Sequence, residues 1–202
     1  MRDELTANTG AHSVYAAKRL VDIALALVAM ILAVVPGLAI ALLVKLTSEG
    51  PVLYWSERVG RYNRKFSMPK FRTMRVDTPA VATHLMSDPD IHLTSPGRFL
   101  RKTSLDELPQ LWNILKGDMS LVGPRPALFN QYDLIDLRTR AGVDALPPGL
   151  TGWAQINGRD ELPIPEKVRL DTEYLRRQSF RFDMRILMLT VGRVLRHEGV
   201  TH

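Results

Sequence analysis

The most prominent pattern in the chain is an uninterrupted apolar run near its N-terminus. Residues 23–44, IALALVAMILAVVPGLAIALLV, contain no charged side chain. An α-helix rises about 1.5 Å per residue, so this run would extend roughly 33 Å, enough for the hydrocarbon core of a bilayer. Core helices of soluble domains seldom continue this far without a polar residue, and the run lies too far from the N-terminus for a usual signal peptide. We therefore predict a helix that stays in the membrane.

Pro36 and Gly37 lie past the middle of this run. Proline lacks a backbone N–H and clashes with the preceding turn, so a bend or break of the helix is expected there. Lys18 and Arg19 precede the run and Lys45 follows it, so the positive-inside rule does not orient a single crossing. Two topologies remain open, a kinked spanning helix and a helix that enters and leaves on one face.

Beyond residue 50 the pattern changes to that of a mixed domain. Residues 51–59 alternate between apolar and polar side chains, turn signals follow at 60–63, and KFSM comes next, which predicts a β-hairpin. Residues 76–97 carry scattered prolines and predict a loop with one short helix. Helical periodicity predicts four further segments, at 105–116, 127–140, 165–178 and 182–197. The last of them is either an amphipathic helix on the membrane surface or an ordinary core helix.

Composition narrows the partners. The chain has 202 residues, 46% of them hydrophobic, which gives room for one ordinary domain. It has no cysteine, which excludes disulfides, thiolate metal sites and a cysteine nucleophile. A net charge of +6 and a pI near 9.8 predict an anionic partner: nucleic acid, an anionic membrane surface or a phosphorylated substrate.

The positive charge gathers directly after the apolar run. No acidic residue interrupts the basic side chains of this stripe, which are Arg58, Arg61, Arg64, Lys65, Lys70, Arg72 and Arg75. No zinc-finger, helix-turn-helix or RNA-binding signature accompanies them. Basic clusters beside a membrane segment attract anionic lipid, and their side chains also bind phosphate groups. We therefore expect anionic lipid and phosphate, and no nucleic acid.

A pair of adjacent carboxylates, Asp106 and Glu107, stands in the stretch KTSLDELPQLWNILKGDMSLVGPRP. Ser104 followed by Glu107 matches a capping box, so both acids could simply begin a helix. Their neighbours suggest chemistry: Arg101 comes just before them, and Arg125 stands in a loop stiffened by prolines. Carboxylates beside guanidinium groups describe a phosphate site with a nucleophile or a metal. The residues alone leave both interpretations open.

At this point the chain resembles the monotopic phosphoglycosyl transferases, also called bacterial sugar transferases. The resemblance rests on Lys18-Arg19, KFRTM, the stretch quoted above, PGLTGWAQINGR and FDMRILMLTVGRVL. This family transfers a sugar 1-phosphate from a UDP-sugar to polyprenol (undecaprenyl) phosphate at the cytoplasmic face of the bacterial inner membrane and releases UMP. The resemblance implies an enzyme of this kind; the alternatives are a catalytically inactive membrane scaffold and a basic nucleic-acid binder.

The resemblance also implies roles for the carboxylate pair. Asp106 would be the nucleophile and Glu107 its partner, with Mg2+ as the cofactor held by both. A carboxylate that attacks the sugar-bearing phosphorus divides the transfer into two displacements through an acyl phosphate. Developing charge on the phosphate oxygens explains the need for Mg2+ and arginines. Whether Glu107 acts as a general base or as a metal ligand stays open.

The remaining predicted site residues fall into two groups. The predicted phosphate-binding side chains are Arg101, Arg125, Lys70 and Arg72, the last two with lipid-surface contacts as an alternative. The predicted nucleotide or sugar pocket comprises Gln155, Asn157 and Arg159, and Trp153 beside them belongs either to this pocket or to the core.

The expected fold is therefore α+β and predominantly helical, with a membrane-embedded re-entrant N-terminal helix and interfacial amphipathic helices. The expected units are a tail (1–17), the membrane helix (18–46) and a cytoplasmic catalytic domain (47–202). One departure concerns the topology: small members of the family carry Ser-Pro at the helix break, whereas this chain has Val35-Pro36, without a hydroxyl to satisfy the freed carbonyl. Larger relatives add membrane helices and a domain before this unit, so we expect the minimal form.

Overall fold

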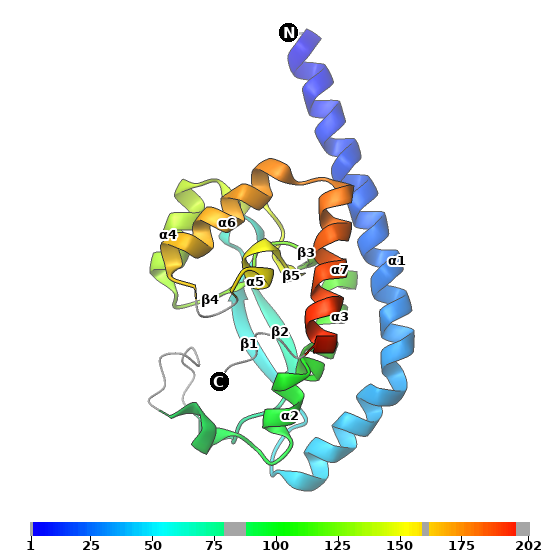
Figure 1. Ribbon diagram of the computed structural model, residues 1–202, viewed down its shortest axis with the longest axis vertical. Coiled ribbons are helices and arrows are strands. Elements are labelled where there is room, and N and C mark those ends of the chain that lie inside the picture. Colours follow the sequence, from blue (N-terminus) through cyan, green and yellow to red (C-terminus); the bar gives the residue numbers. More distant parts are fainter. Residues whose placement is uncertain (1, 79–87, 159–161, 197–202) are drawn as a thin grey trace.

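The computed structural model describes residues 2–78, 88–158 and 162–196. A long N-terminal helix runs along one side of a domain built from short helices around two small sheets (Figure 1). The predicted class, predominantly helical with a minor β component, is confirmed.

Helix α1 (Arg2–Thr47) contains the apolar run and begins well before it, so the predicted tail 1–17 is helical from Arg2 onward. The predicted break at Pro36 and Gly37 is wrong, because α1 remains helical through both residues. Its axis instead bends toward the domain in its last third (Figure 1). A proline inside a helix removes one hydrogen bond and pushes away the preceding turn, which bends a helix without necessarily ending it.

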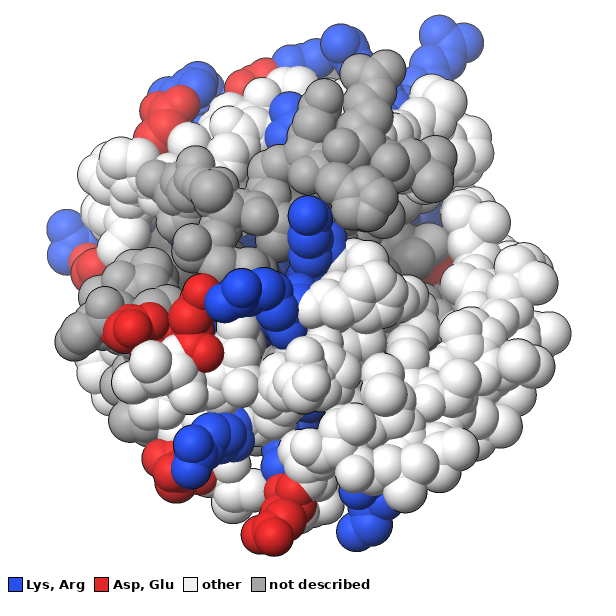
Figure 2. Space-filling model, turned by 60° about the horizontal axis from the view of Figure 1, so that its bottom comes forward, with Lys and Arg blue, Asp and Glu red and all other residues white. Residues whose placement is uncertain are grey.

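The outer face of α1 is exposed and packs against none of the described part of the chain. Ala16–Thr47 is long and apolar enough to cross a membrane, and only 11% of its most apolar window is buried in the protein. The alternative of a buried central helix is therefore excluded. Exposed apolar side chains along this face include Leu20, Leu27, Ile31, Leu32, Val35, Leu38, Leu42 and Leu46. They contribute to the broad uncharged surface on the right of Figure 2.

The inner face of α1 packs on the domain at both ends of the apolar run. Near the first end, Ala26 is fully buried in the main core. Near the second end, Ile40 and Val44 pack with Phe71 and Leu100 in a separate cluster. The helix thus packs on the domain near both ends of its apolar run, and Figure 1 shows it running along one side of the domain.

The predicted hairpin is confirmed. Strands β1 (Leu53–Val59) and β2 (Lys65–Phe71) pair antiparallel, and β4 (Ala127–Leu128) joins the other edge of β1. The turn η1 (Arg61–Asn63) connects the two long strands. A second sheet, not predicted, consists of the parallel strands β3 (Ser120–Val122) and β5 (Gly149–Thr151). Strands this short leave too little alternation for a sequence pattern to reveal them.

The predicted helices are present with shifted boundaries. Residues 105–116 form two elements, because Pro109 lies in a 3-10 turn that precedes the α-helix. The helix predicted at 127–140 begins later, because its first residues form β4. The remaining elements are η3 (Pro89–His92), α2 (Gly97–Lys102), η4 (Leu105–Gln110), α3 (Leu111–Lys116), α4 (Tyr132–Arg140), η5 (Val143–Ala145), α5 (Trp153–Ile156), α6 (Ile164–Arg177) and α7 (Phe180–Arg196).

Candidate active site

The carboxylate pair lies on η4, which packs against β2. The capping box that would explain the pair structurally is not formed: Ser104 is left-handed, with φ of 57°, and its hydroxyl caps nothing. The carboxylate of Glu107 turns instead to Arg125. The structural alternative therefore fails, and the pair is available for chemistry.

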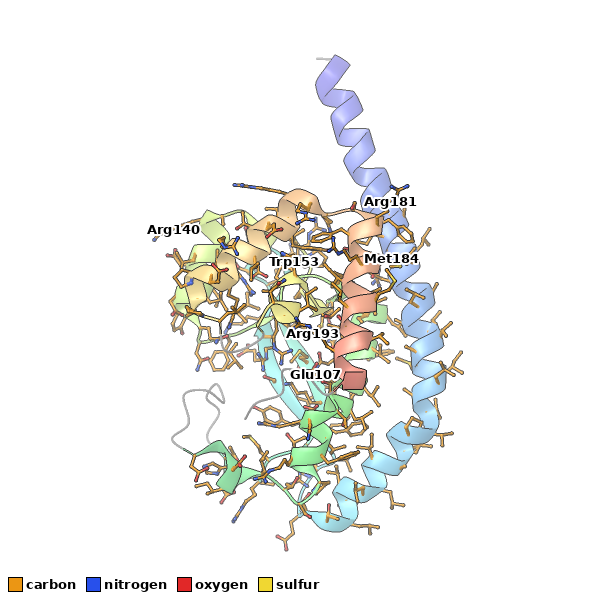
Figure 3. All side chains as sticks on the ribbon, viewed as in Figure 1. Glu107, Arg140, Trp153, Arg181, Met184 and Arg193 are labelled. Carbon is orange, nitrogen blue, oxygen red and sulfur yellow. The ribbon has the colours of Figure 1, made fainter. Side chains whose placement is uncertain are left out.

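Three cationic side chains surround the pair. Glu107 Oε1 lies 3.1 Å from Arg125 Nη2 and 3.9 Å from Lys70 Nζ. Asp106 is buried, with 6% of its surface exposed. Arg101 is close enough to act electrostatically on Asp106 and donates from Nε to Thr73 Oγ1 at 3.0 Å. The fold thus brings together five predicted site residues from three separate segments. Glu107, which is labelled in Figure 3, belongs to this group.

Burial and neighbouring charges shift the pKa values of Asp106 and Lys70. Burial, followed by the neighbouring Glu107 charge, raises the pKa of Asp106 to about 6, against the opposing effect of Lys70, Arg101 and Arg125. Burial also lowers the pKa of Lys70 to about 8. Hydration lowers the reactivity of a carboxylate as a nucleophile. A buried carboxylate that is still ionised at neutral pH has lost much of this hydration.

All three carbonyl oxygens of the loop Pro124-Arg125-Pro126 accept hydrogen bonds. Pro124 O accepts from the Gly149 N–H, and Pro126 O accepts from Arg58 Nη1. Arg125 O accepts from Arg138 Nη1 at 2.8 Å. A backbone with all its carbonyls engaged is rigid, so the Arg125 guanidinium is presented to Glu107 from a fixed base.

Arg138 owes its own position to a buried partner. Its Nε and Nη2 donate to Asp171 Oδ2 at 2.9 and 2.6 Å, and Asp171 is only 1% exposed. Burial raises the pKa of Asp171, and the Arg138 charge counteracts this shift. A chain of contacts therefore runs from α6 through α4 to Arg125 and ends at Glu107. Sequence reasoning missed both members of this pair, because no local pattern links side chains on two different helices.

Arg72 does not join the group, and its predicted role in binding substrate phosphate is corrected. Its guanidinium donates to the carbonyls of Ser48, Glu49 and Pro51, at the turn that follows α1. The side chain is buried there, and each of its three nitrogens donates a hydrogen bond. Arg72 therefore fixes the connection between the membrane helix and the hairpin.

The side chains of the predicted nucleotide or sugar pocket form local hydrogen bonds within their own segment. Gln155 donates to Leu150 O and Asn157 to Trp153 O, and no hydrogen bond or ion pair within the described residues links either to the carboxylate pair. Arg159 lies outside the described residues. The Trp153 ring packs 5.1 Å from that of Phe182, which supports its assignment to the core.

The donor set around Asp106 suits Mg2+ only in combination with a substrate. Within residues 2–78, 88–158 and 162–196, no group of three or more potential metal-binding side chains occurs. Mg2+ is commonly held by one or two carboxylates together with substrate phosphates, so Asp106 and Glu107 fit such a shared site.

A buried Asp106 beside Glu107, surrounded by lysine and arginine on a domain that packs against a long apolar helix, describes a candidate site for phosphate groups in a membrane-associated protein. Comparison with known proteins specifies the class: the sequence profile of bacterial sugar transferases matches residues 13–197. The chain belongs to this family.

Three relatives illustrate its range. The uncharacterized sugar transferase EpsL of Bacillus subtilis is 42% identical over 91% of this chain and 89% of its own length. The UDP-glucose:undecaprenyl-phosphate glucose-1-phosphate transferase of Escherichia coli is 44% identical over 86% of this chain, but over 39% of its own length. The undecaprenyl-phosphate galactose phosphotransferase of Salmonella typhimurium is 39% identical over 90% of this chain and 41% of its own length. The chain therefore spans about two fifths of each of the last two relatives.

Replacement of Arg125 by lysine is expected to impair activity although the charge is kept. Lysine has no planar fork, so it cannot contact Glu107 and a substrate phosphate in the same geometry. We expect a fall of about 10- to 100-fold in kcat/KM, the equivalent of one hydrogen bond to a charged group. Steady-state kinetics would measure it, with the exposed Arg64→Lys as the matched control. Normal kinetics in the Arg125 variant would assign Arg125 to the fold alone.

Proposed function

We propose that the protein transfers a sugar 1-phosphate from a UDP-sugar to polyprenol (undecaprenyl) phosphate and releases UMP, at the cytoplasmic face of the bacterial inner membrane. The observation that carries this proposal is the buried Asp106, paired with Glu107 and surrounded by Lys70, Arg101 and Arg125. The two long relatives above support it, because both names include undecaprenyl phosphate and a sugar.

The proposed reaction has two displacements at one phosphorus. In the first, an Asp106 oxygen bonds to the phosphorus that bears the sugar, and the bond from that phosphorus to the bridging oxygen breaks, so that UMP leaves with this oxygen. In the second, an oxygen of polyprenol phosphate attacks the same phosphorus and frees the Asp106 carboxylate. One diphosphate linkage is lost and another is formed, so no further energy source is required.

The neighbouring residues stabilise the charge that moves during these steps. Arg125 and Arg101 are placed to neutralise phosphate oxygens, and Lys70 does the same from β2. Glu107 orients Arg125 and Lys70 through its ion pairs. As the carboxylate beside Asp106, it would also serve as the general base for the lipid phosphate or as a ligand of Mg2+. Mg2+, held by Asp106, Glu107 and substrate oxygens, would supply further neutralisation when bound.

A UMP-release assay tests the activity. Purified protein would be incubated with polyprenol phosphate, Mg2+ and a panel of UDP-sugars that includes glucose, galactose and N-acetylgalactosamine, the sugars named in the relatives. We expect acceptor-dependent release of UMP with at least one donor. Failure with every donor, by protein that is folded and membrane-bound, would favour an inactive scaffold.

The pH dependence of this activity follows from the two shifted groups. Asp106 must be ionised to attack, so activity is expected to fall as the pH drops through about 6. Lys70 must be protonated to bind phosphate, so activity is expected to fall as the pH rises through about 8. A kcat/KM profile of the free enzyme would show both limits. In Lys70→Arg the upper limit should move to higher pH, and an unchanged upper limit would remove Lys70 from the reaction.

We also propose that α1 enters and leaves the membrane on the cytoplasmic face. Lys18 pairs with Asp183 of α7 at 2.6 Å, and Arg19 donates to the carbonyls that end α3. At the other end, Val44 packs against the domain. A helix attached to one domain at both ends of its apolar run cannot carry one end across the bilayer. The missing hydroxyl before Pro36 is less costly if the helix bends without breaking.

Cysteine labelling tests this topology, because the chain has no native cysteine. Single cysteines at Ser13 and at the exposed Ser67 should both react with an impermeant maleimide in inverted vesicles. Protection of the Ser13 site alone, relieved by detergent, would establish a spanning helix.

A further inference from the structure

Helix α7 carries two exposed arginines near its N-terminal end. Arg181 and Arg185 are exposed, and neither forms an ion pair or hydrogen bond with the part of the chain that the structure describes. The one acidic residue of α7, Asp183, points to the interior, where it binds Lys18 and Tyr174. Two uncompensated guanidinium groups one turn apart are a ready site for an anion.

The same helix carries an exposed apolar strip. Ile186 is fully buried in the core, whereas Phe180, Met188 and Val191 are 61%, 69% and 59% exposed. At 100° per residue, these three side chains share one side of the helix, and Arg181 and Arg185 border that side. An apolar strip edged by arginines is typical of a helix that rests at the membrane surface. Figure 3 shows Arg181 at the N-terminal end of α7, one turn before Met184.

The arginines also share a hollow at the junction of α6 and α7. Its walls are Arg177, Ser179, Arg181, Phe182 and Arg185, and its volume is about 240 Å³. Arg177 pairs with Glu173 and lies over the rings of Phe182 and Trp153, so its charge already has partners within the protein. The hollow is smaller than the roughly 300–1,000 Å³ typical of sites for drug-sized ligands. It suits a single phosphate group with its polar substituent.

Its position indicates the source of that phosphate. Asp183, between the two arginines in sequence, is the residue that anchors Lys18 at the start of the apolar run of α1. The hollow is therefore near the point where α1 meets the membrane. Long arginine side chains beside an apolar strip reach the headgroup layer while their stems remain in the apolar region.

We propose that Arg181 and Arg185 bind the phosphate headgroup of an anionic phospholipid at the α6–α7 junction. The bound lipid fills the hollow with its headgroup, and its acyl chains lie along the apolar strip of α7. This site is separate from the carboxylate pair and does not depend on sugar transfer.

Lipid retention tests the proposal without an activity readout. The full-length protein would be reconstituted in nanodiscs of equal phosphatidylglycerol and phosphatidylcholine, released into neutral detergent, and analysed by native mass spectrometry for lipids that stay bound. We expect preferential retention of phosphatidylglycerol. The double variant Arg181→Gln/Arg185→Gln should weaken this binding about 30-fold, since each basic side chain near an anionic surface contributes about fivefold.

The control variant Arg140→Gln/Arg169→Gln removes the same charge from exposed positions on α4 and α6. It should retain phosphatidylglycerol as the wild type does, and so should Arg181→Lys/Arg185→Lys in large part. Equal loss in the control would reduce the effect to general electrostatics and overturn the site. A wild type without preference for phosphatidylglycerol would overturn it as well, because no anionic headgroup would then be selected. Displacement of the lipid by millimolar inorganic phosphate would reassign the hollow to a soluble phosphate.

Discussion

Asp106→Asn is expected to lower turnover by about 10^3-fold or more, the order found when an enzymatic nucleophile is removed. The substitution keeps the shape of the side chain but removes the charge that attacks phosphorus. Membrane association should be unchanged, because Asp106 does not contact the outer face of α1. UMP release would measure turnover, and Asp118→Asn is the matched control, since Asp118 serves only Asn113 and Lys116 among the described residues.

The two-step reaction makes a stricter demand on the wild type. After incubation with a UDP-sugar and no acceptor, the peptide that contains Asp106 should gain the mass of a sugar phosphate. If rapid-quench samples never contain this adduct while turnover proceeds, direct attack by the lipid phosphate replaces the two-step reaction, and Asp106 becomes a metal ligand.

The variant Asp106→Asn should also be more stable than the wild type at neutral pH. The folded-state pKa of Asp106 is raised from 3.8 to about 6, so the folded protein favours the protonated form and ionisation at neutral pH lowers stability. The cost is absent below about pH 4 and complete above about pH 6. Asparagine avoids it, and we expect a gain on the order of 1–3 kcal/mol at pH 7.5. Thermal unfolding in detergent would detect the gain, which should vanish at low pH.

Sequence reasoning succeeded where patterns were long or the resemblance was specific. The apolar run, the hairpin and the helices have periodicities that extend over many residues, and they are present in the structure. The carboxylates and Lys70, Arg101 and Arg125 were predicted because they stand in motifs, and the fold assembles them. At Pro36 the sequence predicted a break in the helix, but α1 only bends. Its packing on the domain on both sides of the proline keeps the helix continuous.

The residues that reasoning misplaced depend on contacts between distant segments. Arg72 stands in the same KFRTM motif as Lys70, but it lies just past the end of β2, and its guanidinium reaches back to the turn after α1. No sequence pattern distinguishes Arg138 from the other charged residues of α4, and only the packing of α4 on α6 buries it beside Asp171. No sequence spacing encodes either arrangement.

The buried pair Arg138–Asp171 offers the second large effect. Asp171→Asn leaves the buried Arg138 guanidinium without its counter-charge, and removal of one partner of such a pair costs about 3–5 kcal/mol. We expect a marked fall in the thermal unfolding temperature and, at temperatures where the variant is still folded, a fall in kcat. The fall in kcat is expected because Arg138 donates to the Arg125 carbonyl, and a displaced Arg125 no longer contacts the substrate phosphate.

A double variant separates the two effects. Arg138→Met/Asp171→Leu replaces both charges by apolar side chains, which is often neutral or stabilising for a buried pair. Its unfolding temperature should return toward that of the wild type, but its kcat should remain at least about tenfold reduced, because neither side chain can donate to Arg125 O. The exposed pair on α4, Arg140 and Asp136, supplies the control: Arg140→Met/Asp136→Leu should change neither quantity appreciably. If kcat recovers together with stability, the buried pair supports only the packing of α4 on α6, and Arg125 is positioned by its other loop contacts.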